Sequence, residues 1–237
     1  MSTEAIEMKK KHGTAGFSLV ELLVGTILFT IVTGIAFSLL MSSQLRYQGE
    51  SSVTEAFQQA NVALDQIVRD VHSAGYPPMS SLSATVENAN PTLYALPFAW
   101  APNYPTTPCT VGVGGTCMVP GQYDLILEAD LGSGVQWIRY LLQTTTLMRA
   151  VVRKSSKDPV TETSGSALVP YLENVMNGSN SLPIFSYVCD PGALQQPSYI
   201  REVNVSLMVR SLQPDPQTHQ YRTITLTGQA MRFNPNQ

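Results

Sequence analysis

The chain has 237 residues and a formal net charge of −3, and 13% of its residues are charged, about half the usual share. This composition argues against a nucleic-acid-binding protein, which would need a basic surface. It also argues against a disordered chain, which would combine high charge with low hydrophobicity. The length suits one domain of ordinary size with a long appendage.

The N-terminal segment joins a basic cluster to a long apolar run. Lys9, Lys10 and Lys11 are followed by 25 residues, Phe17–Met41, with a single charge at Glu21. As a helix this run would span about 37 Å, enough to cross a hydrocarbon core of about 30 Å. The lysines would hold the N-terminus in the cytoplasm, so that the rest of the chain lies outside it. A secretory signal peptide fits less well, because the run is too long and no A-x-A cleavage pattern follows it.

Glu21 is the informative residue of the apolar run. A carboxylate inside a bilayer costs about 2.5–3.5 kcal/mol on insertion scales, so an intramembrane acid is by default a functional hypothesis. A plain membrane anchor would explain the length of the run and the lysines, but it would not explain the acid.

The residues around Glu21 also carry a family resemblance. Gly16-Phe17-Ser18-Leu19-Val20-Glu21, after a basic leader and before an apolar helix, resembles the type IV prepilin cleavage and methylation motif. The resemblance implies cleavage after Gly16 by a prepilin peptidase, methylation of the new N-terminal Phe17 and assembly into a helical filament. It also implies that Glu21 pairs with the α-amino group of a neighbouring subunit. Small or hydroxylated residues that suit close helix packing are Gly25, Thr26, Thr30, Thr33 and Gly34.

Helical periodicity continues into the more polar sequence that follows. An apolar stripe is formed by Val53, Phe57, Ala60, Leu64, Ile67 and Val71. Gly75 and the Pro77-Pro78 pair signal the end of the helix. We therefore expect one helix over 17–74 whose second part docks on the protein's own globular domain, with a coiled coil to another chain as the alternative. The expected organisation is a leader (1–16), a transmembrane or filament-core helix (17–41), its continuation (42–76) and an extracytoplasmic β-rich domain (77–237).

The second half of the chain is typical of an antiparallel β-sheet, preceded by an irregular segment over 77–122. Strands are predicted at 123–128, 135–142, 147–152, 202–210 and 221–233, with a weaker candidate at 182–188. The last two are expected to pair with each other. A sheet packed on a long helix gives an α+β class, and the family resemblance implies the type IV pilin fold.

The strand region makes the resemblance more specific. It includes Asp130 with Gly132 and Gly134, Trp137-Ile138-Arg139-Tyr140, Leu147-Met148-Arg149, and the helix end Asp70–Tyr76. These residues resemble PilW-type minor pilins and the related J-type pseudopilins of type II secretion. The resemblance implies a minor pilin that joins or primes a type IV pilus. Its partners would be other pilin subunits, the prepilin peptidase and the inner membrane, before it reaches the pilus or cell surface. A type II secretion pseudopilin, or a membrane-tethered adhesion module that does not polymerise, is the alternative.

The cysteines predict one disulfide. Cys109 and Cys117 enclose a glycine-rich segment that closes easily, and a bridge would form in an oxidising compartment. Pairing of Cys189 with either of them is the alternative. Zinc is not expected, because the cysteines and His12, His72 and His219 show no ligand spacing.

No catalytic motif stands out, so we expect neither an enzyme nor a cofactor. The acidic cluster Asp124, Glu128 and Asp130 offers ligands for calcium, but strand alternation separates them and a solvated sheet edge is favoured. The basic stretch Arg149, Arg153, Lys154 and Lys157 is expected to be a solvated strand end and loop, with DNA or surface binding by a pilus tip as the alternative.

Overall fold

The structure, a computed structural model, describes residues 16–78 and 92–233. The chain divides into two compact units, Met1–Tyr47 and Gln48–Gln237, and each is described by itself. Most of the predicted leader, with its lysines, and part of the predicted irregular segment lie outside the described residues.

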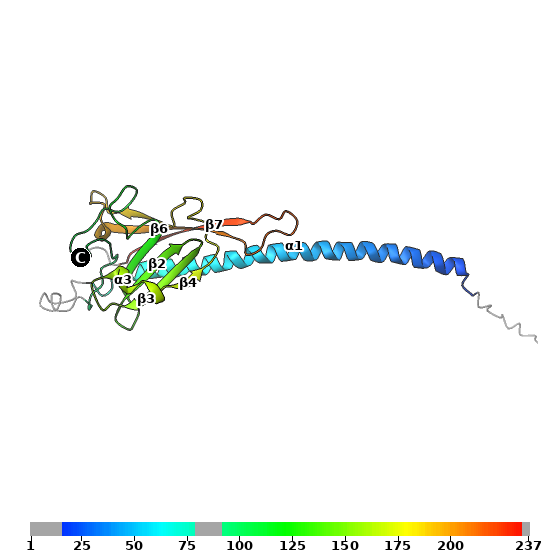
Figure 1. Cartoon of the computed structure of the whole chain (residues 1–237), viewed down its shortest axis with the longest axis horizontal. Coiled ribbons are helices and arrows are strands. Elements are labelled where there is room, and N and C mark those ends of the chain that lie inside the picture. The colour runs from blue at the N-terminus through cyan, green and yellow to red at the C-terminus, as the bar shows by residue number, and fades with distance from the viewer. Residues whose placement is uncertain (1–15, 79–91, 234–237) are drawn as a thin grey trace, which may run out of the picture. The chain divides into compact units, whose positions relative to one another are not determined.

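The first element, α1, is one helix from Leu19 to Ser73 (Figure 1). It begins two residues later than predicted, and the backbone amide of Leu22 donates to the Ser18 carbonyl at 3.1 Å. After Ser73 the chain turns at Gly75, whose φ of +81° favours glycine. A Cβ at Gly75 would also lie 2.8 Å from the Pro97 ring. The predicted stop signal is therefore confirmed.

Two antiparallel sheets follow, where the sequence predicted one. The first has the order β1-β2-β3-β4 and the second β5-β6-β7. Their bounds are β1 Asp124–Asp130, β2 Val135–Gln143, β3 Thr146–Arg153, β4 Val169–Leu172, β5 Phe185–Cys189, β6 Ile200–Arg210 and β7 Thr223–Met231. Short helical turns lie at α3 Pro159–Glu162, η2 Gly165–Ala167 and η3 Pro197–Tyr199. The α+β class and the β6–β7 pairing are confirmed, whereas β4 was missed because only four residues form it.

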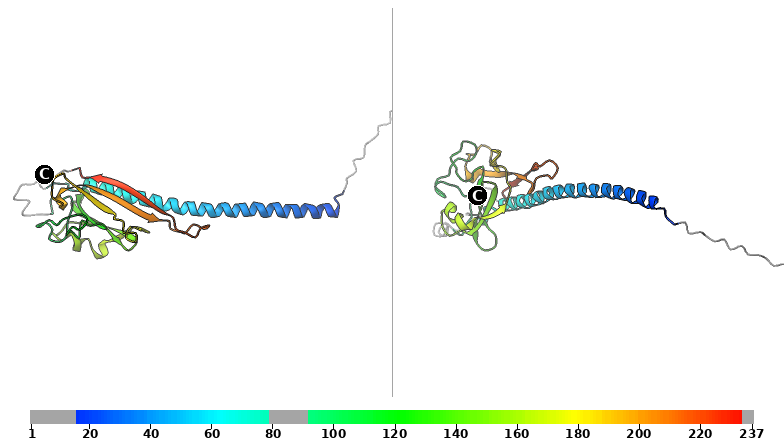
Figure 2. Two further views of the ribbon diagram at one scale, coloured as in Figure 1. Left: turned by 90° about the horizontal axis from the view of Figure 1, so that it is seen from above. Right: turned by 45° about the vertical axis from the view of Figure 1, so that its right-hand side comes forward.

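Within the C-terminal unit, β7 follows the last turns of α1 (Figure 2). The Ser52 hydroxyl accepts from the Gln213 amide at 3.0 Å, and His72 Nδ1 lies 2.6 Å from the Met231 carbonyl oxygen. Between these points a Cβ at Gly228 would come within 3.0 Å of the Leu64 side chain. Glycine in β7 thus permits a close approach of strand and helix.

The prediction that the apolar stripe of α1 docks on the globular domain is correct for most of its residues and wrong for one. Ala60, Leu64, Ile67 and Val71 join a core shared with both sheets, as expected for docking on the protein's own domain. Phe57, by contrast, is 43% exposed. Small residues complete the buried line of α1 instead: Gly49, Ser52, Ala56 and Ala63. At Gly49 the space for a side chain is limited by the segment between β6 and β7, because a Cβ there would lie 3.3 Å from the Pro216 ring.

Candidate functional site

The candidate site begins in the non-helical residues that precede α1. Gly16 and Phe17 are both exposed, and the Phe17 side chain is 78% accessible. A Cβ at Gly16 would meet nothing within 4 Å. The bond that the motif marks for cleavage therefore lies in an exposed, non-helical stretch of chain, directly before α1 begins.

Glu21 lies in the first turn of α1 and is exposed. An acid in the first turn is stabilised by the partial positive charge of the helix N-terminus. Glu21 forms no ion pair within the described part of the chain, where the ion pairs all lie in the C-terminal unit. Its carboxylate is thus available to a cation supplied from outside this chain.

The helix around Glu21 is apolar on every side. Its length and composition would let it cross a membrane, and none of its most apolar stretch is buried within the structure. Gly25 and Gly34 leave open space where a Cβ would stand. The hydroxyl of Thr26 donates to the Leu23 carbonyl at 2.9 Å and that of Thr30 donates to Ile27 at 2.8 Å. These hydroxyls are satisfied within the helix, so lipid or another helix can cover them at low cost.

In the C-terminal unit, an ion pair ties the end of α1 to the first sheet. The Asp70 carboxylate accepts from the Tyr140 hydroxyl at 2.6 Å and from Arg149 Nη2 at 2.8 Å. Gln66, one turn earlier, donates to the same carboxylate at 2.7 Å. Burial and the Asp70 charge raise the pKa of Tyr140 well above its usual range, so the phenol stays a donor. The sequence analysis named Asp70 only as part of the helix end that resembles minor pilins and predicted no partner for it, although an acid beside Ile67 and Val71 in the apolar stripe is a usable signal.

A second ion pair is fully enclosed on the face of the first sheet that carries Ile126 and Trp137, opposite the face that packs on α1. Lys154 Nζ lies 2.7 Å from Glu128 Oε2, and the two side chains are 1% and 0% exposed. The rings of Tyr94, Tyr104 and Trp137 surround the ammonium at 4.9–5.7 Å. The Tyr104 hydroxyl also donates to Glu128. Burial raises the pKa of the Glu128 carboxyl, and Lys154 opposes that rise.

The acidic cluster predicted for a solvated sheet edge is wrong in two of its three members. Glu128 is buried, and Asp124 forms a bidentate pair with Arg139 at 2.9 and 2.7 Å. Asp130 instead accepts from the amides of Gly132 and Gly134 and shapes the β1–β2 turn. Acids paired across strands are separated in sequence from their cations, so local patterning could not reveal them. No group of side chains suited to a metal ion occurs among the described residues.

The basic stretch is likewise not a solvated surface. Lys154 is buried against Glu128. The Arg149 side chain is bonded to Asp70 and is only 20% exposed. Arg153, at the end of β3, and Lys157 lie nearer the surface. Two of the four cations, Arg149 and Lys154, are thus paired with acids inside the domain, so the four residues do not form an extended basic surface.

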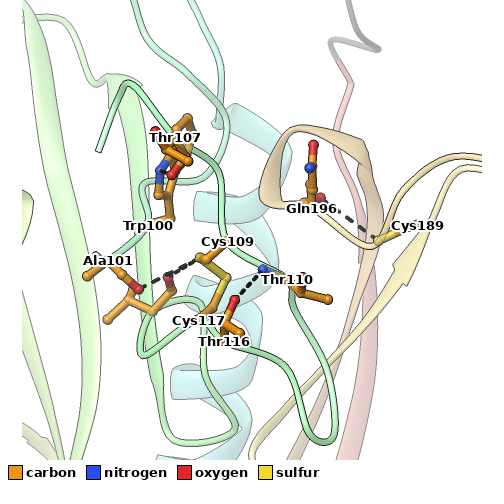
Figure 3. The surroundings of a disulfide bond; sticks show 10 residues. Trp100, Ala101, Thr107, Cys109, Thr110, Thr116, Cys117, Cys189 and Gln196 are labelled. Carbon is orange, nitrogen blue, oxygen red and sulfur yellow. Dashed lines mark hydrogen bonds between the residues drawn. A yellow bond between two sulfur atoms is a disulfide. The ribbon is translucent and has the colours of Figure 1, made fainter. Parts of the chain in front are cut away.

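The structure joins Cys109 to Cys117 in a disulfide, the pairing that the sequence favoured (Figure 3). Inside the closed loop, the Thr110 amide donates to the Thr116 hydroxyl at 3.0 Å. Next to it, Trp100 Nε1 donates to the Thr107 carbonyl at 3.0 Å. Cys189 is a free thiol, buried beside the Gln196 carbonyl, and burial raises its pKa.

Comparison with known proteins supports the N-terminal motif. A family described as the prokaryotic N-terminal methylation motif matches residues 11–37, which include Gly16, Phe17 and Glu21. No curated protein and no solved structure matches the chain. The matched segment supports a type IV pilin-like or pseudopilin protein that prepilin peptidase processes.

Proposed function

We propose that the chain is a minor pilin that joins, or primes, a type IV pilus. The observation that carries this proposal is the coincidence of the N-terminal methylation motif with an exposed apolar helix that holds one acid, Glu21, in its first turn. In this proposal, cleavage follows Gly16, and Phe17 becomes the methylated N-terminus of the mature subunit.

Glu21 then acts in assembly. Cleavage creates an α-amino group at Phe17, which is mostly protonated at neutral pH because its reference pKa is about 7.7–8.0. In a dry bundle of helices, an unpaired Glu21 would be costly, and the amine of a neighbouring subunit is a cation at the matching depth. Pairing at a defined depth would also set the axial register between subunits.

Before assembly, the helix over 17–41 is proposed to anchor the chain in the inner membrane. The three lysines upstream would stay in the cytoplasm, where the prepilin peptidase would act. The residues from 42 onward, including the disulfide-bonded domain, would then face the periplasm. Assembly exchanges lipid around the apolar helix for other pilin helices and brings the domain to the pilus surface.

Mass spectrometry of the N-terminus tests the processing step. In a host with an active prepilin peptidase, the mature chain should begin at a methylated Phe17. Replacement of Gly16 by a bulky residue should leave the leader attached. A native chain that keeps residues 1–16 in that host would contradict the proposal.

Deletion of the gene tests the machine that uses the subunit. Loss of surface pili, restored by the native gene, is expected for a minor pilin. Intact pili combined with loss of protein secretion would assign the chain to a type II secretion pseudopilus instead.

A further inference from the structure

One edge of the second sheet is formed by β7, which pairs with β6 on one side only. The Ser211 amide donates to the Arg222 carbonyl at 2.7 Å, and this pattern continues along the ladder, so the even-numbered residues of β7 bond to β6. The odd-numbered residues turn their amide and carbonyl groups to the outer edge. Within the described residues, no hydrogen bond pairs the backbone groups of the four that precede Met231: Thr223, Thr225, Thr227 and Gln229.

The other outer strands of the two sheets are covered or short. β1 borders the segment after α1, where the Asp130 amide donates to the Tyr76 carbonyl at 2.9 Å, and β5 borders the end of the irregular segment, where the Phe185 amide donates to the Gln122 carbonyl at 3.0 Å. β4 has four residues, one of which is Pro170. β7, in contrast, is nine residues long and contains no charged residue and no proline. An edge that lacks these protections is a template for pairing with another strand.

A half-exposed aromatic ring lies beside this edge on α1. β7 follows α1 in the same direction (Figure 2), and Leu64 is the residue that a Cβ at Gly228 would meet at 3.0 Å. Phe57 precedes Leu64 by seven residues, which is nearly two turns, or about 10 Å, along the same face of the helix. Thr225 precedes Gly228 by three residues, which is also about 10 Å. Phe57, whose side chain is 43% exposed, is therefore level with Thr225, where an added strand would cover its ring.

A second copy of this chain is a poor partner for the edge. If two β7 strands paired in antiparallel orientation, their α1 helices would run in opposite directions, which the proposed anchoring in one membrane does not allow. If they paired in parallel about a two-fold axis, identical residues would lie directly opposite each other, whereas the bonds of a parallel ladder slant between residues. The edge of β5 is already bonded to Gln122, so β7 of one copy cannot extend the sheet of the next through it. The occupant is therefore a different polypeptide, a conclusion that rests on the proposed function through the membrane anchoring.

From the unpaired edge, its lack of charge and proline, and the ring beside it, we propose that β7 binds a β-strand of a different polypeptide. That strand becomes the fourth of the second sheet. Its backbone bonds to the outward groups of β7, which supplies affinity, and Phe57 selects an apolar side chain at the matching position. The partner segment is thus extended and, like β7 itself, uncharged, and its apolar residues alternate with polar ones.

Binding of a synthetic strand to the full chain in detergent tests the proposal. The probe is a fluorescent peptide with the sequence of residues 203–209, because this part of β6 is uncharged, alternates between a buried and a less buried face, and already pairs with the inner side of β7. It should bind with a Kd at or below about 100 μM, and a control peptide with proline in place of Val205 and Ser206, one on each edge of the strand, should bind about tenfold more weakly or worse. Hydrogen exchange at the amides of Thr225 and Thr227 should slow when the probe binds, because these amides point to the outer edge.

Two pairs of variants locate the bound strand. Thr225→Pro removes one outward amide, and proline is tolerated on an edge strand where its nitrogen faces away from the ladder. It should weaken binding of the probe by about tenfold or more, whereas Thr225→Val keeps the amide and should bind as the native chain does. Phe57→Ala should weaken binding by about threefold or more, whereas Val62→Ala, at another exposed apolar residue of α1, should not.

Thermal unfolding shows which variants fold, and Phe57→Ala decides the test if Thr225→Pro does not fold. Three outcomes overturn the proposal. The probe does not bind the folded native chain, the folded Thr225→Pro and Phe57→Ala variants bind it as the native chain does, or light scattering shows that the native chain dimerises and Thr225→Pro does not. None of them bears on processing after Gly16, so failure of this proposal is distinguishable from failure of the proposed function.

Discussion

In the N-terminal unit Glu21 is exposed among apolar residues and forms no ion pair within the described part of the chain. In the C-terminal unit, by contrast, Asp70, Asp124 and Glu128 are enclosed, and each meets a lysine or arginine at 2.7–2.8 Å. An acid that the fold satisfies internally contributes to the fold. An acid that the fold leaves unsatisfied on an apolar surface needs a partner from elsewhere, which is why assembly is assigned to Glu21.

The largest effect is expected where the partner lies outside the chain. Glu21→Gln should nearly abolish incorporation into the filament while membrane insertion is kept, because the neutral amide cannot form an ion pair with an ammonium group but inserts more easily. Fractionation of membranes and sheared filaments measures both quantities. Glu50→Gln, at an exposed acid further along α1, is the control and should assemble normally. Normal assembly of Glu21→Gln would remove the pairing role.

Glu128→Gln should have the largest effect on folding. It leaves the buried Lys154 ammonium without a counter-charge, which costs about 3–5 kcal/mol in such sites. The free energy of unfolding, from denaturant titration of the full chain in detergent, measures the loss. A change below about 1 kcal/mol would show that the aromatic rings alone hold the lysine.

Lys154→Met should make stability depend on pH. Without the ammonium, burial raises the pKa of Glu128 further above its ordinary value. The native state of the variant then binds a proton that the unfolded state has lost, so its stability falls as the pH rises from about 5 to 8. Unfolding midpoints across this range check the slope, with the native chain as the reference. A variant whose stability rises with pH would contradict this sign.

The disulfide is expected to contribute less. Removal of both sulfurs in a Cys109→Ser, Cys117→Ser variant should cost about 2–3 kcal/mol, because the closed loop is short. A similar fall in the free energy of unfolding should follow reduction of the native chain. If reduction of the native chain leaves the free energy of unfolding unchanged while the double variant is unstable, the disulfide does not stabilise the domain. The loss in the variant would then come from packing of the two serines.

Asp70→Asn is expected to have the smallest effect, about 1–2 kcal/mol. The amide keeps the shape and much of the hydrogen bonding, and Arg149 is partly exposed, so its lost pairing is screened by solvent. Hydrogen exchange of the last turns of α1 would show local loosening before global stability changes. Equal loosening in Glu50→Gln would mean that the effect is not specific to Asp70.

Local sequence patterns were sufficient to predict those features that lie within a single helix, strand or turn. The long helix, its stop at Gly75 and the alternating strand β6 could be predicted because each depends on residues close in sequence. The prediction that the apolar stripe of α1 is buried was wrong at Phe57, because the approach of β7 to α1 decides which face of the helix is covered. The prediction of a solvated acidic cluster was wrong because the cations come from elsewhere in the chain. Arg139 lies in β2 and Lys154 directly follows β3, and only the pairing of the strands brings them beside Asp124 and Glu128.

The N-terminal motif, the apolar helix with its single acid, the α+β class and the favoured cysteine pair could all be predicted without coordinates. These features are covalent or follow from short-range periodicity. Tertiary packing alone establishes that there are two sheets, that α1 docks partly through small residues and that Asp70, Asp124 and Glu128 are enclosed with cations. Such contacts join residues far apart in the chain, so their energies depend on packing that local sequence does not encode.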